Sequence, residues 1–98
     1  MAKLDRNGYA PSILGSEDGV CYFCGATDTV RHEIIGGSSR QISKREGFWV
    51  ALCVPHHRIV HENEAYAERF LRRPCMRKYL EDHTEAEWME LIGRNYGE

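Results

Sequence analysis

Two sets of residues in this sequence are typical ligands of metal ions. The first set has four members: Cys21, Cys24, Cys53 and His56. The second set has three members: His32, His57 and His61. Four such ligands suit a closed structural zinc site, whereas three leave a position open for water or substrate, as in a catalytic site. The sequence therefore predicts two metals with different roles.

The spacing of the ligands differs between the two sets. The four-ligand set consists of a C-x-x-C pair and a C-x-x-H pair, which is typical of zinc, and the alternative is a group of buried or free thiols. In the other set, the pair His57-x-x-x-His61 and the single His32 are each weak signals. The pair gains weight from its position, because it continues the helix that is predicted to begin at the zinc ligands. Together the three histidines could bind a divalent ion.

The length of 98 residues fits one small domain, for which a structural zinc is a common means of stabilisation. In a secreted protein, the four cysteines could instead form two disulfides. We recognise no signal peptide and no stretch long enough to cross a bilayer, and therefore expect a cytoplasmic protein with no membrane partner. In that compartment, metal binding is favoured over disulfide formation.

The net charge of −2 argues against a protein that is basic overall, but the charges are unevenly distributed. Residues 74–98 carry an acidic excess. Residues 31–58 carry a basic excess, contributed by Arg31, Arg40, Lys44, Arg45 and Arg58. Because this positive excess lies among the predicted metal ligands, it would favour a phosphate backbone there. The alternative is an ordinary scatter of surface charge.

Local patterns predict an arm or loop at residues 1–19 and a single domain at residues 20–98. The domain is expected to contain a zinc knuckle at 21–25, a strand–strand–helix core at 28–62 and C-terminal helices at 64–93. Within the core, we expect strands at 29–35 and 48–52 and a helix at 54–62. The polar segment 38–47 is predicted to be a loop or one short helical turn.

These elements determine which way the histidines point. Neighbouring helical residues point about 100° apart, while residues four apart share a face, so His56 and His57 could serve different metals. In the first strand, alternation places His32 on the face opposite to Arg31 and Glu33.

The C-terminal region is predicted to be a scaffold. Helices are expected at 65–73 and 75–82, and Pro74 should break or restart the helix between them. Thr84 and Glu87 form a capping box for a last helix, which should end at Gly93. Other residues are expected not to bind metal: Cys75 as a core thiol, His83 as a helix-end or surface residue, and Phe48, Trp49 and Trp88 as core aromatics.

The segments CYFCG, RHEIIGGSSR and GFWVALCVPHHRIVH resemble the HNH endonucleases of phages and prophages, and the closing WMELIGRNY is similar to the tail of the same group. The resemblance covers residues 20–96. It implies an α+β fold, namely a small zinc-stabilised ββα-metal (treble-clef-like) domain with additional C-terminal helices. It also implies a metal-dependent DNA endonuclease in a bacterial cytoplasm, with DNA as a partner and phage terminase or other packaging proteins as further partners.

The resemblance assigns roles to individual residues. It implies Zn²⁺ as the structural ion, held by Cys21, Cys24, Cys53 and His56. A second divalent ion such as Mg²⁺, Mn²⁺, Ni²⁺ or Zn²⁺ would be held by the catalytic residues His32, His57 and His61. Arg40 would hold a phosphate. Glu33 stands where the family usually has the histidine that acts as general base, as in HEI variants of the phage type.

Two departures from the family keep alternatives open. The family's central asparagine is missing from the region around Arg45 to Phe48. Glu33, with an ordinary pKa of about 4.3, is ionised at neutral pH but is a weaker base than histidine, and it could instead be a fourth ligand. The protein could therefore be a zinc-stapled DNA-binding module that has lost cleavage, or an adaptor that contacts a packaging or replication complex through its acidic C-terminal region.

Overall fold

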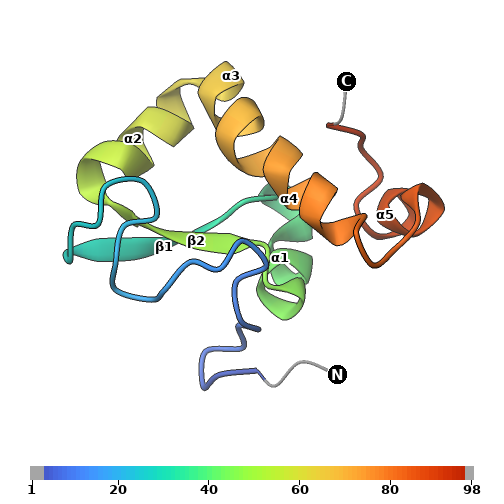
Figure 1. Ribbon diagram of the computed structural model, residues 1–98, viewed down its shortest axis with the longest axis horizontal. Coiled ribbons are helices and arrows are strands. Elements are labelled where there is room, and N and C mark those ends of the chain that lie inside the picture. The colour runs from blue at the N-terminus through green and yellow to red at the C-terminus, as the bar shows by residue number, and fades with distance from the viewer. Residues whose placement is uncertain (1–3, 97–98) are drawn as a thin grey trace.

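Two antiparallel strands, β1 (Thr29–Glu33) and β2 (Trp49–Cys53), form the sheet at the centre of the fold (Figure 1). In their register, Thr29 lies opposite Cys53 and Glu33 lies opposite Trp49. The computed structural model describes residues 4–96. Strands and helices are both present, so the predicted α+β class is confirmed.

Helix α2 (Val54–Glu62) follows β2 directly, with Cys53 as its N-cap and Pro55 in its first turn. Proline is tolerated there because the first N–H groups of a helix have no partner within it. The helix has the bounds predicted from the sequence, and it contacts both strands. The end of β2 and the start of α2 thus bring Cys53 close to the histidines that follow it.

The segment between the strands is more helical than predicted. A 3₁₀ turn, η1 (Gly37–Ser39), leads into α1 (Arg40–Glu46), so the expectation of a loop or one short turn was wrong. This helix was not predicted because its sequence has little apolar periodicity. Its inner face consists of Ile42, which packs on the core, and the buried Ser43. α1 ends at Gly47, whose φ of +82° is left-handed and where an added Cβ would lie 2.1 Å from the Pro11 carbonyl oxygen.

Ser43 joins α1 to the end of β1. Its hydroxyl donates to the Ile35 carbonyl at 2.6 Å and accepts the Ile35 N–H at 3.2 Å, in a fully buried position. Ser43→Ala should lower the free energy of unfolding by about 1–3 kcal/mol, because it leaves two buried backbone groups without a partner. Urea denaturation measures this change. The exposed Ser38→Ala is the control, and an equal loss in both variants would contradict the prediction.

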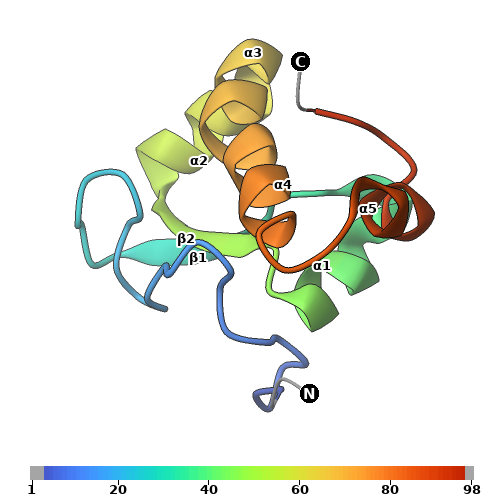
Figure 2. The ribbon, with the colours of Figure 1, turned by 45° about the vertical axis from the view of Figure 1, so that its right-hand side comes forward.

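A long helical segment follows α2 and arches above the sheet (Figure 2). It comprises α3 (Glu64–Ala67), the π-helix η2 (Glu68–Arg72) and α4 (Arg73–Tyr79). The Arg73 N–H bonds to the Glu68 carbonyl, five residues back, immediately before Pro74. Proline lacks an N–H and crowds the carbonyl four residues back, so this wider turn lets the chain restart as α4 without a break.

The last helix, α5 (Glu85–Leu91), begins with the predicted capping box of Thr84 and Glu87. Its Trp88 is 1% exposed and packs on Phe48 and Tyr79. The expectation that Phe48, Trp49 and Trp88 are core aromatics is confirmed by their burial. The C-terminal helices therefore share one core with the sheet.

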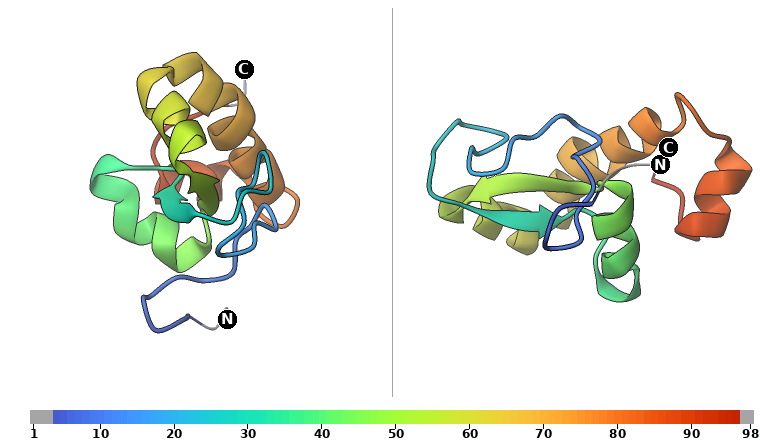
Figure 3. Two further views of the ribbon diagram at one scale, coloured as in Figure 1. Left: turned by 90° about the vertical axis from the view of Figure 1, so that its left-hand side faces the viewer. Right: turned by 90° about the horizontal axis from the view of Figure 1, so that it is seen from below.

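Residues 4–20 contain no helix or strand and run beside β2, as the view from below shows (Figure 3, right). The Ser12 hydroxyl donates to the Trp49 carbonyl, and the Ser16 hydroxyl accepts the Ala51 N–H. The segment thus provides hydrogen-bond partners for the edge of β2 that does not face β1. Within residues 4–96, no helix is both long and apolar enough to span a bilayer.

Candidate metal centres

The four predicted zinc ligands lie together at the junction of β2 and α2. Their ligand atoms all lie within 4.8 Å of one another: Cys21 Sγ, Cys24 Sγ, Cys53 Sγ and a ring nitrogen of His56. The first two come from a tight turn in which the Gly25 N–H bonds to the Cys21 carbonyl. Gly25 completes this turn with a left-handed φ of +80°. The four residues could therefore hold a metal ion such as zinc.

The distances within this cluster fit a tetrahedral zinc. Zn–S and Zn–N bonds of about 2.3 and 2.05 Å place tetrahedral ligand atoms about 3.8 Å (S–S) and 3.5 Å (S–N) apart. The Cys24 and Cys53 sulfurs are 3.8 Å apart. His56 Nδ1 lies 3.7 Å from the Cys21 sulfur and 3.2 Å from the Cys53 sulfur. None of the four cysteines of the chain forms a disulfide.

The surroundings of Cys21 favour the thiolate that binds metal. Burial alone would raise the pKa of this thiol, but hydrogen bonds from neighbouring backbone N–H groups, that of Cys53 foremost, lower it to about 6. Cys75 differs, because it is fully buried and burial raises its pKa. Its predicted role as a core thiol is therefore confirmed.

The three histidines of the second predicted set meet on a different face of α2 from His56. His57 and His61 share one face of the helix, with their Nε2 atoms 3.0 Å apart, and His32 of β1 contacts both rings. The three ligand nitrogens also lie within 4.8 Å of one another. Burial and the neighbouring histidine charges lower the pKa of His32 to about 4, and burial also lowers that of His57. Neutral imidazole is the form that binds metals, so this donor set could hold a divalent ion.

The three histidines open into a cavity of about 520 Å³. Two ion pairs also line it. Arg40 pairs with Glu33 at 3.2 Å, and Arg72 pairs with Glu64 at 2.6 Å. The cavity therefore combines three imidazole rings with the guanidinium groups of Arg40 and Arg72, each of which is paired with a carboxylate.

Glu33 is the last residue of β1 and lines the same cavity as the three histidines. One carboxylate oxygen accepts a hydrogen bond from the Arg40 guanidinium, and the other accepts one from the Tyr9 hydroxyl. Arg31 also contacts Tyr9, which agrees with the predicted placement of Arg31 and Glu33 on one face of β1, although Glu33 also lines the histidine cavity from the end of the strand.

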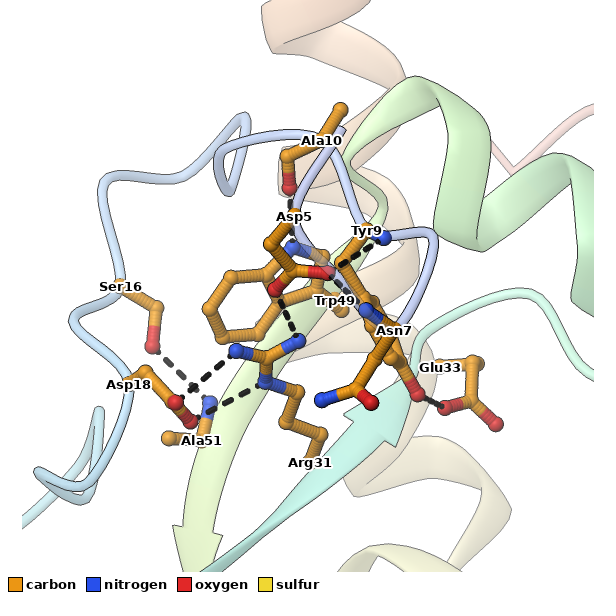
Figure 4. Close-up of polar contacts among 10 residues, drawn as sticks. All are labelled: Asp5, Asn7, Tyr9, Ala10, Ser16, Asp18, Arg31, Glu33, Trp49 and Ala51. Atoms are coloured by element: carbon orange, nitrogen blue, oxygen red, sulfur yellow. Dashed lines mark hydrogen bonds and ion pairs between the residues drawn. The ribbon is translucent and has the colours of Figure 1, made fainter. Parts of the chain in front are cut away.

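One arginine of the basic excess predicted between residues 31 and 58 lines the cavity but is bound by acidic side chains. The Arg31 guanidinium binds Asp18 and Asp5, each at 2.8 Å, and lies over the rings of Tyr9 and Trp49 (Figure 4). These aspartates neutralise its charge, and its side chain is only 17% exposed. Arg31 of β1 thus binds two side chains of the N-terminal segment and holds this segment against the sheet.

Sequence reasoning missed three residues of the site: Tyr9, Glu64 and Arg72. Tyr9 belongs to the segment that was predicted to be an arm, and Glu64 and Arg72 belong to the region that was predicted to be a scaffold. Their segments lie far from β1 in the sequence, so only knowledge of which distant segments are in contact could have identified them. His83 is exposed and stacks on Tyr79, which agrees with its predicted place at a helix end.

The fold and the first cluster define a small α+β protein with a Cys₃His group that could hold metal. Comparison of the chain with protein-family models, with curated proteins and with solved structures found no match.

Proposed function

We propose that this protein is a metal-dependent DNA endonuclease of the HNH type, built on a ββα-metal domain. The observation that carries the proposal is the convergence of three imidazoles from β1 and α2 in a cavity that is also lined by two carboxylate–guanidinium pairs. The resemblance of residues 20–96 to phage-type HNH proteins supports it. On the same resemblance, we expect a phage or prophage origin and partners in DNA packaging.

In the proposed reaction, His32, His57 and His61 would hold the divalent ion. When bound, the ion supplies Lewis-acid stabilisation of the charge that develops on the phosphate and the leaving oxygen. Glu33 acts as the general base and takes a proton from the attacking water. We favour this role over that of a ligand because Tyr9 and Arg40 bind its two oxygens.

Arg40 and Arg72 hold the DNA backbone in this proposal. Arg40 is the more accessible, with 66% of its side chain exposed. A phosphate that enters the cavity can accept charge-assisted hydrogen bonds from both guanidinium groups. The carboxylates that now pair with them keep the groups oriented in the absence of substrate.

The proposal is tested by metal counting and plasmid nicking on the purified full chain. Elemental analysis should find one zinc and, after equilibration with Mn²⁺ or Ni²⁺, a second divalent ion. Supercoiled plasmid should be nicked with Mg²⁺, Mn²⁺ or Ni²⁺, and EDTA should stop the reaction. One zinc, no second ion and no nicking would contradict the proposal. If DNA is still bound in that case, the protein is a DNA-binding module without cleavage.

Arg72→Ala should weaken DNA binding roughly tenfold or more, because a hydrogen bond to a charged group contributes about 1.5–3 kcal/mol. The slope of log K against log salt should fall by about 0.9, the value for one lost phosphate contact. Fluorescence anisotropy with a short duplex, in zinc-loaded protein without a second divalent ion, measures both quantities.

Arg69→Ala is the matched control for this substitution. Arg69 belongs to the same π-helix, η2, but does not line the cavity, so the variant removes the same charge elsewhere. Equal weakening in the two variants would mean that Arg72 contributes only general charge.

A further inference from the structure

Tyr9 contacts the proposed base from a distant part of the chain. Its hydroxyl donates a hydrogen bond to Glu33 Oε2, while the Arg40 guanidinium binds Oε1 (Figure 4 shows the Tyr9 contact). We propose that Tyr9 is a positioning residue, which holds the Glu33 carboxylate in the orientation required to accept a proton from water. This inference rests on the proposed function, because it takes Glu33 to be the base.

The backbone at Tyr9 is held in place by a closed turn. Asp5 Oδ1 accepts the N–H groups of Asn7 and Tyr9, both at 2.9 Å, and the Asp5 N–H donates to the Tyr9 carbonyl at 2.8 Å. The second oxygen of Asp5 binds Arg31 of β1 at 2.8 Å. The turn is thus tied to the strand that carries Glu33, and the tyrosine backbone is fixed relative to it.

The ring of Tyr9 is held from several sides. It meets the Trp49 ring edge-on, with centroids 5.8 Å apart, and the Arg31 guanidinium lies 4.4 Å from its centroid. The Lys44 ammonium lies 5.0 Å from the same centroid. Such cation–π contacts favour one placement of the ring. The hydroxyl therefore reaches Glu33 from a ring that has little freedom to move.

The other partner of Glu33 constrains it less. The Arg40 side chain is 66% exposed, and exposed ion pairs are weak because solvent screens them and long side chains lose entropy. The Glu33 side chain is only 13% exposed. A hydroxyl-to-carboxylate bond on a fixed ring is charge-assisted, and it restricts rotation of the carboxylate more than Arg40 alone would. The N-terminal segment thus contributes a residue to the site.

Tyr9→Phe tests this inference, because it removes the hydroxyl and keeps the ring between Trp49 and Arg31. A general base typically accelerates a reaction by about 10²–10⁴-fold. Partial loss of the Glu33 orientation should therefore lower kcat for nicking roughly tenfold and leave KM unchanged. The temperature of unfolding should change little. Tyr66→Phe, on α3 and outside the cavity, is the control and should leave kcat unchanged.

A double-mutant cycle separates positioning from other effects. Glu33→Gln removes the base, and in that background Tyr9→Phe should have no further effect on kcat. Equal effects of Tyr9→Phe in both backgrounds would overturn the inference while leaving the nuclease proposal intact. Absence of nicking by the wild-type protein would overturn both.

A readout independent of activity is the crystal structure of the zinc-loaded protein and of its Tyr9→Phe variant. The Glu33 carboxylate should have one orientation in the wild type and more than one in the variant. A single, unchanged orientation in both structures would overturn the positioning role.

Discussion

Replacing Cys24 by serine is expected to leave the chain without zinc and largely unfolded at room temperature. Cys24 is exposed, so the loss of its packing costs little. Its sulfur nevertheless lies 3.8 Å from that of Cys53, in a cluster that joins the 21–25 turn to the start of α2. Structural zinc contributes about 10–16 kcal/mol in small zinc-finger peptides, which matches or exceeds the total stability of about 5–15 kcal/mol typical of a domain.

Circular dichroism and elemental zinc analysis of the purified variant measure this outcome together. Cys75→Ala is the control, because it removes a thiol from the core without touching the cluster. It should retain zinc, and its free energy of unfolding should fall by about 1 kcal/mol, a common cost of a single substitution. A Cys24→Ser protein with native circular dichroism and an unchanged melting temperature would show that the cluster is not a structural zinc site.

The parts of the fold that depend on neighbouring residues could be predicted. The spacing of C-x-x-C and C-x-x-H, together with Pro55, placed a helix from residue 54 to residue 62 beside the four ligands, and helix geometry separated His56 from His57. Strand alternation placed Arg31 and Glu33 on one face of β1, where both contact Tyr9. These predictions use the helix and strand periodicities, which relate residues two or four positions apart, and they do not depend on how distant segments pack.

The parts that depend on distant segments could not be predicted. α1 is polar on most of its surface, and it becomes recognisable only when Ser43 is seen to bind Ile35 across the turn. The Tyr9–Glu33 bond joins residues 24 positions apart, and Arg31 is neutralised by aspartates 13 and 26 positions away. No local pattern encodes such contacts, because each side chain is unremarkable in its own segment.

His57→Ala is expected to abolish detectable nicking while leaving the fold and the zinc in place. His57 belongs to the three-histidine cluster and points away from the zinc ligands, and alanine favours the helix in which it lies. Loss of this ligand removes an ion that contributes several kcal/mol of transition-state stabilisation. Because each 1.36 kcal/mol is tenfold in rate, the rate should fall by at least about 10²–10³-fold.

The matched control for His57→Ala is His83→Ala, which removes an exposed histidine outside both clusters. It should nick at the wild-type rate and bind the same number of metals, whereas His57→Ala should retain one zinc and bind no second ion. His32→Ala should behave like His57→Ala, because His32 supplies the only ligand of the cluster that comes from β1. Nicking that survives both substitutions would exclude the three histidines as the catalytic centre without affecting the zinc assignment, because the two clusters share no residue.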